Sequence, residues 1–448
     1  MPIELQTLAF DPADARAALS QLPASPAVFA LYGAEAKDEP YIGRTPNLRG
    51  RLERLLQPSP RHPRRLQLAG RVRRIGWRLT GSDFESLLAQ FSLLDEIYGA
   101  KALERMHLRA PAFVRFLGSN RYPRITVTNR PSQREAEWAY GPFASRAAAE
   151  RYAEEALKLF LLRRCTDDLN PDPNHPGCVY SEMKMCLAPC YQGCTDPRYE
   201  SEAAAVQSFL ATRGESRLVA LRSERDEASA RMEFETAAAI HAQVQRVEAV
   251  HALAPELVRP MNQLRAVILQ PAANFDEVAV FLFDHGRLRG PVAFSTLGMR
   301  IQNEQSGSSS LFSHPLALEP VPEEPAIKQQ ESELGKQPSE LGGIPSADAQ
   351  IIEAAPDPAA AALKRPARGV LEARLDEVLS RLAEDSEPPS PTTRQGHLAL
   401  LKRWYYRPEV RRPGEIFFPD TEGGWPVRTM LRGVGRVAAK MLTATHRA

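Results

Sequence analysis

Short apolar runs separated by polar loops mark the first 110 residues of the chain. Two β-type runs, residues 28–31 and 41–43, are joined by a polar loop and predict a hairpin. Leucines then recur at helical spacing through residues 48–56, and residues 77–79 are a candidate third strand. Residues 82–97 begin with candidate N-cap residues and continue with the apolar spacing of a helix. The pattern predicts a small α/β domain.

The middle of the chain has mainly helical periodicity. Residues 147–162 form one helical stretch, and residues 200–252, rich in Ala, Glu and Arg, indicate an antiparallel pair of helices. Residues 264–296 then alternate between apolar and polar positions, which is typical of strands.

Beyond the strand-like region the chain becomes acidic and loses its aromatic residues. Residues 313–403 contain no Phe, Trp or Tyr, and residues 305–360 hold nine acids against two lysines, a net charge of −7. Such a segment buries too little apolar surface to offset the entropy of ordering it. We therefore expect a disordered linker, interrupted by one amphipathic helix with apolar positions Leu371, Leu375, Val378 and Leu382.

Together these patterns predict an α+β multidomain protein, and the length of 448 residues favours two to four domains. The predicted parts are a small α/β domain at 1–110, connecting strands, a helix and a cysteine region at 111–200, a helical hairpin at 201–253, a small β-containing unit at 260–300, a long disordered acidic linker at 305–395 and a short basic C-terminal block at 397–448.

The overall charge excludes few classes of partner, whereas the hydropathy of the chain argues against a membrane protein. Lys and Arg total 57 against 55 Asp and Glu, so the net charge is only +2. The apolar runs are too short to cross a bilayer, and the first residues show no export signal. We expect a cytoplasmic protein with reduced thiols and no membrane partner.

Positive charge is concentrated in residues 44–78, which hold eleven arginines and one acid, Glu53. The local balance of +10 creates a field that attracts polyanions, and arginine suits bidentate contact with phosphate. A solvated helix face is the alternative, but the lack of compensating acids favours binding of nucleic acid. The candidate DNA contacts are Arg49, Arg54, Arg64, Arg65, Arg71, Arg73 and Arg74.

All five cysteines lie within one window of 30 residues. Cys165, Cys178, Cys186 and Cys190 are separated by 12, 7 and 3 residues, and Cys194 follows. Clustered thiols in a reducing compartment indicate coordination of a soft metal. Zinc sites usually show two close pairs, and four cysteines can equally hold an iron–sulfur cluster. Both remain open on the spacing, as does a set of small buried thiols.

Three short motifs lie in and before the arginine-rich stretch. Residues 26–29 read Pro-Ala-Val-Phe, residues 41–44 read Tyr-Ile-Gly-Arg, and residues 47–51 read Asn-Leu-Arg-Gly-Arg. They resemble the GIY-YIG nuclease domain in the C component of excinuclease ABC. That component makes the incisions in bacterial nucleotide excision repair, so the resemblance implies a metal-dependent DNA endonuclease fold.

The resemblance also implies roles for single residues. Phe29 stands where the family has its first tyrosine, and Tyr41 matches the tyrosine implicated in activating or positioning water. Arg44 occupies a place usually held by lysine, and Arg51 matches the arginine expected at the scissile phosphate. The family's metal-binding glutamate is replaced by Gln90.

The change at Gln90 bears directly on catalysis. A hard divalent cation prefers charged oxygen ligands, and a neutral amide is a poor substitute. We therefore expect Mg²⁺ or Mn²⁺ only if the nuclease is active. The alternative is a catalytically lapsed domain that binds DNA without cutting it.

The cysteine window and the helical pair extend the resemblance. Residues 163–165, 176–178 and 184–190 resemble the cysteine segment of the same excinuclease component. This implies a [4Fe–4S] cluster, with zinc as the alternative, on Cys165, Cys178, Cys186 and Cys190. Cys194 lies outside that pattern, and His175 is a possible additional ligand.

Residues 231–240 resemble the turn of the short helical hairpin through which the B and C components of excinuclease ABC associate. The resemblance implies a partner like the B component, with contacts at Phe234, Ala238 and Val244. A small hairpin buries its apolar stripe poorly and can be covered by a partner helix. The alternative is an ordinary amphipathic hairpin that packs against its own protein.

Two expectations concern the remainder of the chain. The RNase H-like nuclease of the full-length C component is not recognisable, because the acids of the linker lie in no strand-like context. Residues 433–439 fit the Gly-x-Gly-x-x-x-Ala form of helix–hairpin–helix DNA binders, or else a glycine-ended turn before a C-terminal helix.

The resemblance therefore implies a short, divergent relative of the C component of excinuclease ABC that binds DNA and incises it in nucleotide excision repair. Two alternatives stay open. One is a lapsed GIY-YIG protein that serves as a DNA-binding scaffold, and the other is a DNA-binding regulator that senses redox state through an iron–sulfur cluster.

Overall fold

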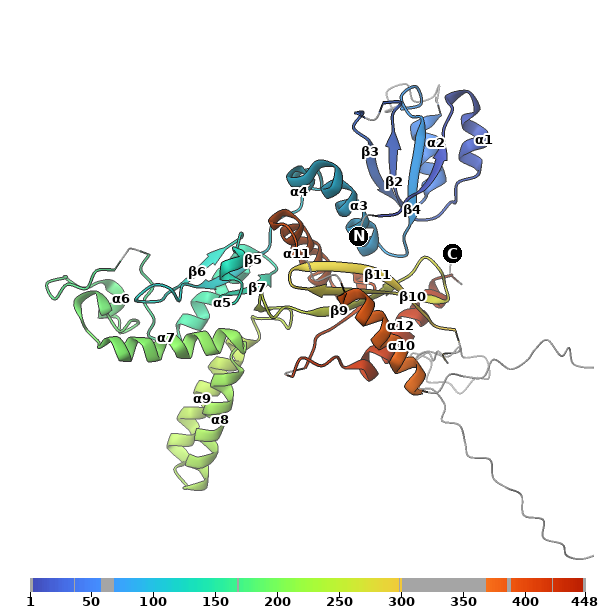
Figure 1. Ribbon diagram of the computed structural model, residues 1–448. Coiled ribbons are helices and arrows are strands. Elements are labelled where there is room, and N and C mark those ends of the chain that lie inside the picture. The colour runs from blue at the N-terminus through green and yellow to red at the C-terminus, as the bar shows by residue number, and fades with distance from the viewer. Residues whose placement is uncertain are drawn as a thin grey trace, which may run out of the picture.

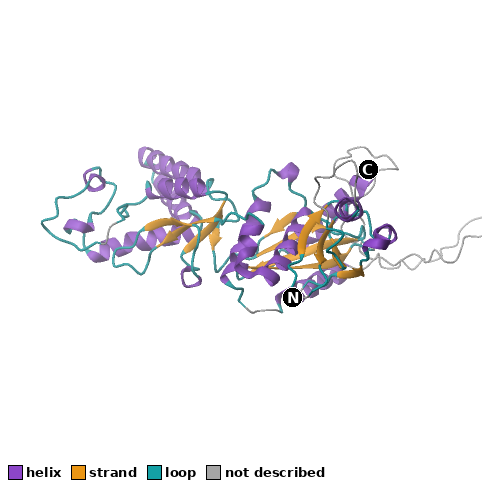
Figure 2. Ribbon diagram, turned by 90° about the horizontal axis from the view of Figure 1, so that it is seen from above, coloured by secondary structure: helices purple, strands orange, loops and turns teal. Residues whose placement is uncertain are grey.

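The computed structural model describes residues 3–297, 299 and 368–445, apart from positions 36, 58–67, 167–168, 385–387 and 421. In this part of the chain, helices surround three four-stranded antiparallel sheets (Figure 1). The α+β class is confirmed at this level. In both views the middle sheet lies to one side, while the first and last sheets lie together on the other (Figure 2).

The first sheet has the strand order β1-β4-β2-β3. Its strands are β1 (Gln6–Ala9), β4 (Arg74–Leu79), β2 (Ala27–Tyr32) and β3 (Tyr41–Thr45). β2 and β3 form the hairpin that the sequence predicts, and β4 contains the predicted third strand. The helices of this domain are α1 (Ala15–Ser20), α2 (Leu48–Leu56) and α3 (Asp83–Tyr98).

Strand alternation directs neighbouring side chains of β2 to opposite faces of this sheet. Phe29 packs in one cluster with Leu48 and Leu52 of α2, whereas Val28 packs with Ala89 and Leu93 of α3. The helices α2 and α3 therefore cover opposite faces.

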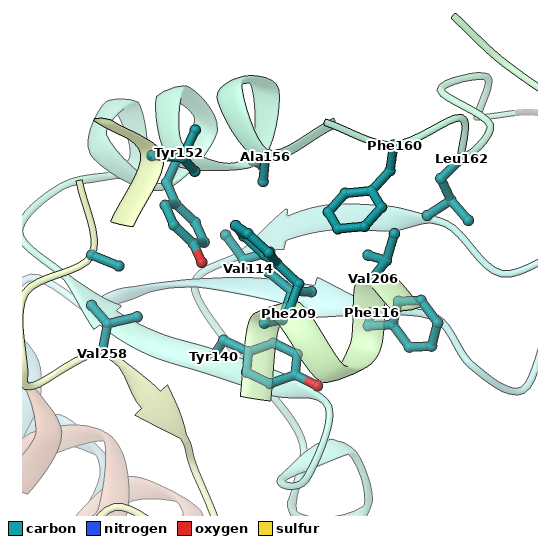
Figure 3. Packing of buried hydrophobic residues seen from close by; sticks show 14 of the residues in the cluster. Val114, Phe116, Tyr140, Tyr152, Ala156, Phe160, Leu162, Val206, Phe209 and Val258 are labelled. Carbon is teal, nitrogen blue, oxygen red and sulfur yellow. The ribbon is translucent and has the colours of Figure 1, made fainter. Parts of the chain in front are cut away.

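The middle sheet has the order β6-β5-β7-β8, and its last strand comes from far along the chain. Its strands are β5 (Ala112–Phe116), β6 (Ile125–Thr128), β7 (Ala139–Phe143) and β8 (Arg259–Pro260), with the helices α4 (Ala102–Arg105), α5 (Arg146–Leu157), α6 (Val179–Glu182) and α7 (Asp196–Ala211) before or around them. Phe209 of α7 packs with Tyr140 and Tyr152 in the core (Figure 3). β8, which follows the helical pair of residues 215–251, thus adds the last strand to a sheet whose other strands precede that pair.

The two helices predicted over residues 200–252 correspond to α8 (Glu215–Ala230) and α9 (Phe234–His251), while α7 is a separate helix before them. The pair projects away from the middle sheet (Figure 1). Only its base joins the core, through valines such as Val244 and Val247.

The last sheet is sandwiched between helices. Its order is β11-β10-β9-β12, with β9 (Ala266–Pro271), β10 (Glu277–Asp284), β11 (Arg287–Ser295) and β12 (Glu415–Phe417), and its helices are α10 (Arg368–Ala383), α11 (Pro391–Tyr405) and α12 (Val427–Thr445). Val280 and Leu282 face a cluster with α10 and α12. Phe281 and Phe283 face the opposite side, towards α11. Both faces of the sheet are therefore apolar, because helices cover both of them.

This arrangement corrects the predicted boundary between linker and C-terminal block. The amphipathic helix expected within the linker is α10, and Leu371 and Leu375 are buried against the sheet. α11 begins at Pro391, inside the region predicted to be disordered. The amphipathic helix predicted at Leu371–Leu382 is thus confirmed, whereas the prediction of disorder is wrong at residues 391–395, because the apolar face of α11 packs against a sheet that the local composition does not reveal. Residues 305–367 lie outside the described part.

The glycine motif near the C-terminus forms no hairpin. Residues 433–439 lie within the single helix α12, so both the helix–hairpin–helix interpretation and the alternative of a glycine-ended turn are wrong. A Cβ atom at Gly433 would lie 2.5 Å from the Phe417 ring. The glycine is therefore needed because α12 crosses β12 closely.

Helix α3 belongs to two cores at once. One side of it packs on the first sheet through Ala89 and Leu93. The other side contributes Phe84, Leu88 and Phe91, among others, to the cluster that contains α11 and the last sheet. A Cβ atom at Gly396 of α11 would lie 2.1 Å from the Phe91 ring, so the two helices are in close contact. α3 thus joins the first domain to the C-terminal unit.

Candidate functional site

Three of the predicted catalytic-site residues lie together on the α2 side of the first sheet. Arg51 Nη2 donates a long hydrogen bond of 3.4 Å to Tyr41 Oη. The Phe29 ring is 6.1 Å from the Tyr41 ring and is buried, with 1% of its surface exposed. Asn47 caps α2 by accepting the Gly50 N–H, which fixes the helix that carries Arg51. The polar groups presented by this trio are the Tyr41 hydroxyl and the Arg51 guanidinium.

The other two predicted residues lie on the α3 side. Arg44 is three positions beyond Tyr41 in β3, so its side chain points to the opposite face. There it forms an ion pair with Asp83, the first residue of α3. Gln90 is partly exposed on the same helix. The structure therefore does not gather all five predicted residues on one face of the sheet.

Asp83 is a residue that the sequence analysis missed. Its second carboxylate oxygen accepts a hydrogen bond of 2.7 Å from Arg407, which follows α11. Burial raises the pKa of Asp83, but hydrogen bonds and charges from Arg407 and Arg44 outweigh burial and hold that pKa below its usual range. Its position beside Ser82 signals only a helix start, so its role as an ionic link between domains is visible only in the fold.

The carboxylates nearest Gln90 in sequence are engaged elsewhere. Glu85 is 5% exposed and accepts the Gly81 N–H at 2.8 Å; burial raises its pKa. Asp95 accepts a hydrogen bond of 2.7 Å from the Thr393 hydroxyl of α11. Within the described ranges, no three His, Cys, Asp or Glu side chains are grouped so that they could hold a metal ion.

The arginine-rich surface lacks acidic partners. None of the described candidates forms an ion pair with a described carboxylate, and several donate to backbone carbonyls instead, as Arg49 does to Leu22 O at 2.7 Å and Arg54 to Gly50 O at 2.9 Å. Arg71, Arg73 and Arg74 are exposed, and Arg74 stacks over the Tyr32 ring. Arg64 and Arg65 lie outside the described residues. The positive charge of this surface is thus largely uncompensated.

The four predicted cluster cysteines are neighbours in space. Burial raises the pKa of Cys186 to about 11, and the negative charges of Cys165, Cys178 and Cys190 add to the rise. Burial likewise raises the pKa of Cys190, with Cys178 and Cys165 contributing. The four cysteines are therefore close enough for a charged thiolate at Cys165 or Cys178 to raise the pKa of Cys186 and Cys190, but within the described residues they do not converge on a single coordination point.

Local contacts hold the cysteine segment against α7. The Leu187 N–H donates to Leu161 O at 3.0 Å, and the Tyr199 hydroxyl receives the Arg163 N–H at 3.1 Å. Arg163 Nη1 also lies 3.6 Å from Cys165 Sγ. His175 is exposed, and its Nδ1 accepts a hydrogen bond of 3.0 Å from the Gly177 N–H within the same loop.

The tip of the α8–α9 hairpin is apolar and exposed. Met232, with a left-handed φ of 61°, is 76% exposed, and Phe234 is 68% exposed. Ala238 is also exposed, whereas Val244 is only 2% exposed and packs in the middle core. Of the three predicted partner contacts, Phe234 and Ala238 are accessible and Val244 is not.

Comparison with known proteins identifies the class to which these features point. Residues 113–211 match the family model described as the UvrC/Cho excinuclease, middle domain, a range that begins in β5 and ends with α7. The resemblance found in the sequence is confirmed at the level of the family: this protein is like the C component of excinuclease ABC.

Similar curated proteins carry the corresponding name. The UvrABC system protein C of Alcanivorax borkumensis is 30% identical over 227 residues, which cover 50% of this chain and 37% of that protein. The UvrABC system proteins C of Aliivibrio fischeri and Bradyrhizobium diazoefficiens are both 24% identical, over 53% and 61% of this chain and 38% and 39% of their own lengths. The chain thus spans less than half the length of these relatives. No solved structure matches it.

Among the described residues, no helix is both long enough and apolar enough to cross a bilayer.

Proposed function

We propose that this protein acts in nucleotide excision repair in the manner of the C component of excinuclease ABC and binds DNA through the first domain. The observation that carries the proposal is the joint presence of the UvrC-type middle domain and of the described arginines 49, 54, 71, 73 and 74, none of which pairs with a described acid. Backbone phosphates of DNA are the ligands that such a surface favours, through charge and counterion release. Arg51 lies between Arg49 and Arg54 on α2 and, with Tyr41, would contact the strand.

The DNA-binding proposal predicts a measurable effect of Arg71. The side chain is exposed and makes no described ion pair, so Arg71→Gln should leave the fold intact. We expect weaker binding to duplex DNA and a log–log salt dependence whose slope falls by about 1 in magnitude, as for loss of one phosphate contact. Fluorescence anisotropy over a salt series measures both.

Arg246→Gln is the matched control, because Arg246 is an exposed arginine of α9 on the remote hairpin. An equal loss of binding in both variants, or no salt-sensitive binding by the native chain, would contradict the proposed DNA surface.

For catalysis, we infer that the first domain binds DNA without cutting it. The ligand position of the metal holds Gln90, and the neighbouring carboxylates Asp83, Glu85 and Asp95 are each committed to contacts described above. Tyr41 and Arg51 would still position a phosphate, since neither role requires a metal. If a metal were held by a carboxylate in place of Gln90, it would supply Lewis-acid stabilisation of the phosphate charge.

Restoring the carboxylate tests this inference. We expect the native chain to leave damaged duplex DNA intact with Mg²⁺ or Mn²⁺, and Gln90→Glu to gain nicking, because a charged oxygen returns to the ligand position. Gel analysis of nicked plasmid measures the gain, and Gln90→Glu with Tyr41→Phe is the control that should lose it. Nicking by the native protein that disappears on Tyr41→Phe would instead establish the second candidate function, incision.

We also propose that Cys165, Cys178, Cys186 and Cys190 hold a [4Fe–4S] cluster, with zinc as the alternative. Four cysteine thiols gathered in one segment of a chain are typical ligands of a soft metal. The surrounding loops would need to bring the sulfurs closer together. When bound, the group would cross-link the segment between Cys165 and Cys190.

Metal analysis of anaerobically purified protein tests the cluster. We expect about four iron and four sulfide per chain with visible absorbance, and we expect Cys186→Ser to lose them, because one of four ligands is gone. Cys194→Ser, outside the proposed set, should keep them. A stoichiometric zinc ion without sulfide would support the alternative, and a metal-free protein would refute both.

Finally, we propose that the exposed hairpin tip binds a protein like the B component of excinuclease ABC. Phe234 is a large exposed apolar side chain at the end of a projecting hairpin, which is the geometry of an anchor residue for a partner helix. The buried base of the hairpin, including Val244, would hold the tip in place.

Substitution at the tip should separate partner binding from folding. We expect Phe234→Ala to weaken binding of the purified B component at least tenfold, because the substitution removes an aromatic anchor from the interface. The stability of the free protein should not change, because Phe234 is exposed there. Val219→Ala, which removes an apolar side chain that is 59% exposed on α8, is the control. Isothermal titration should show a smaller change for it, and equal effects would argue against a specific anchor.

A further inference from the structure

A cleft with arginines on both walls lies between the middle sheet and the C-terminal unit. It encloses about 710 Å³ and is bounded on one side by Phe113 of β5 and the loop 129–134 after β6. The other wall consists of positions 391, 394, 395 and 398, which recur along one face of the first two turns of α11. The cleft uses neither Tyr41 nor the arginine surface of the first domain.

The cleft has positive walls and no acidic lining. Arg130 and Arg134 come from the loop, Arg394 comes from α11, and none of the described lining residues is Asp or Glu. Arg130 and Arg134 are exposed and form no ion pair with a described residue. The two walls therefore present cations to the same space, and an anion between them would be attracted by both.

Arg394 is built into the cleft wall. It is 9% exposed, and burial lowers its pKa, although a guanidinium remains charged at neutral pH. Its aliphatic stem lies against the turn between β10 and β11, where a Cβ atom at Gly286 would be 2.8 Å from Arg394 Cγ. Gly286 has a φ of +79°, which glycine adopts without strain. The turn thus makes room for the arginine.

The cleft also contains an unmet hydrogen-bond acceptor and an apolar floor. Asn129 Oδ1 is buried and has no hydrogen-bond partner in the described part of the chain. A buried acceptor without a donor is unfavourable, so a ligand N–H would be stabilising there. Phe113, Leu398 and the prolines at 111, 131 and 391 supply flat and aliphatic surface beside it.

We propose that this cleft binds one nucleotide unit. Its phosphate would contact Arg130, Arg134 and Arg394, and its base would lie on the apolar floor and donate an N–H to Asn129. The volume is within the range of small-molecule sites and exceeds what an inorganic anion fills. An anion, a flat apolar body and an N–H donor are together the chemistry of a nucleotide. Where that nucleotide is an unpaired unit of a DNA strand, the inference rests on the proposed function; a free nucleotide is the other source.

The test uses the full chain and two labelled probes, dAMP and a single-stranded tetranucleotide, with inorganic phosphate as competitor. The variant Arg130→Gln/Arg134→Gln removes both exposed cations and should fold normally. We expect it to weaken probe binding at least tenfold, and we expect Asn129→Leu to weaken dAMP binding while leaving competition by phosphate unchanged. Arg403→Gln, an exposed arginine of α11 outside the cleft, should have no effect.

The outcomes separate the sources and the hypotheses. Binding of dAMP but not of the tetranucleotide indicates a free nucleotide, and tighter binding of the tetranucleotide indicates a strand. No saturable binding of either probe up to millimolar concentration, or equal binding by the double variant, overturns the inference.

If the probes do not bind the cleft but Arg71→Gln still weakens duplex binding, the nucleotide site is refuted and the proposed function is retained. If Arg71→Gln has no effect while the cleft variants lose dAMP, the proposed function falls and the free-nucleotide site remains.

Discussion

The burial of helix α3 on two sides is the constraint that fixes the arrangement of this protein. Ala89 and Leu93 serve the core of the first domain, and Phe84, Leu88 and Phe91 serve the core shared with α11. Phe84 meets both Phe281 and Trp404, with ring centroids 5.2 and 5.5 Å apart. Burying each such side chain contributes about 1.5–3 kcal/mol. One helix thus makes the first domain and the C-terminal unit parts of a single packed assembly.

The ionic contacts at this junction follow from the same packing. Because α3 starts beside the end of α11, Asp83 reaches Arg44 of the first sheet and Arg407 of the C-terminal unit. The side chains of Arg44 and Arg407 are 35% and 27% exposed, so solvent screens the pairs and they contribute modestly to stability. Their main consequence is positional: Arg44 is held on the α3 side, away from the face that carries Tyr41 and Arg51.

The proposed binding functions are distributed over separate parts of the fold. The arginine surface belongs to the first domain, the cysteines lie against α7, the exposed tip ends the α8–α9 hairpin, and the nucleotide cleft lies where the middle sheet meets α11. A protein that contacts DNA and a partner at several points gains affinity because each contact raises the effective concentration for the next. The proposed binding surfaces would therefore not depend on a metal at the position of Gln90.

Local sequence patterns specified several of the elements and the groups that carry chemistry. The β2–β3 hairpin, α2, the cap of α3 and the α8–α9 pair all follow from short-range periodicity and capping, and the arginine and cysteine clusters are visible in composition alone. What those elements pack against emerged only from the folded chain. α10 and α11 look like parts of a linker, and the glycines of α12 like a DNA-binding turn, because most of their packing partners are remote in sequence, in β9–β11 above all. Long-range burial, the Asp83 link and the two walls of the nucleotide cleft are properties of contacts between distant segments, which no local pattern records.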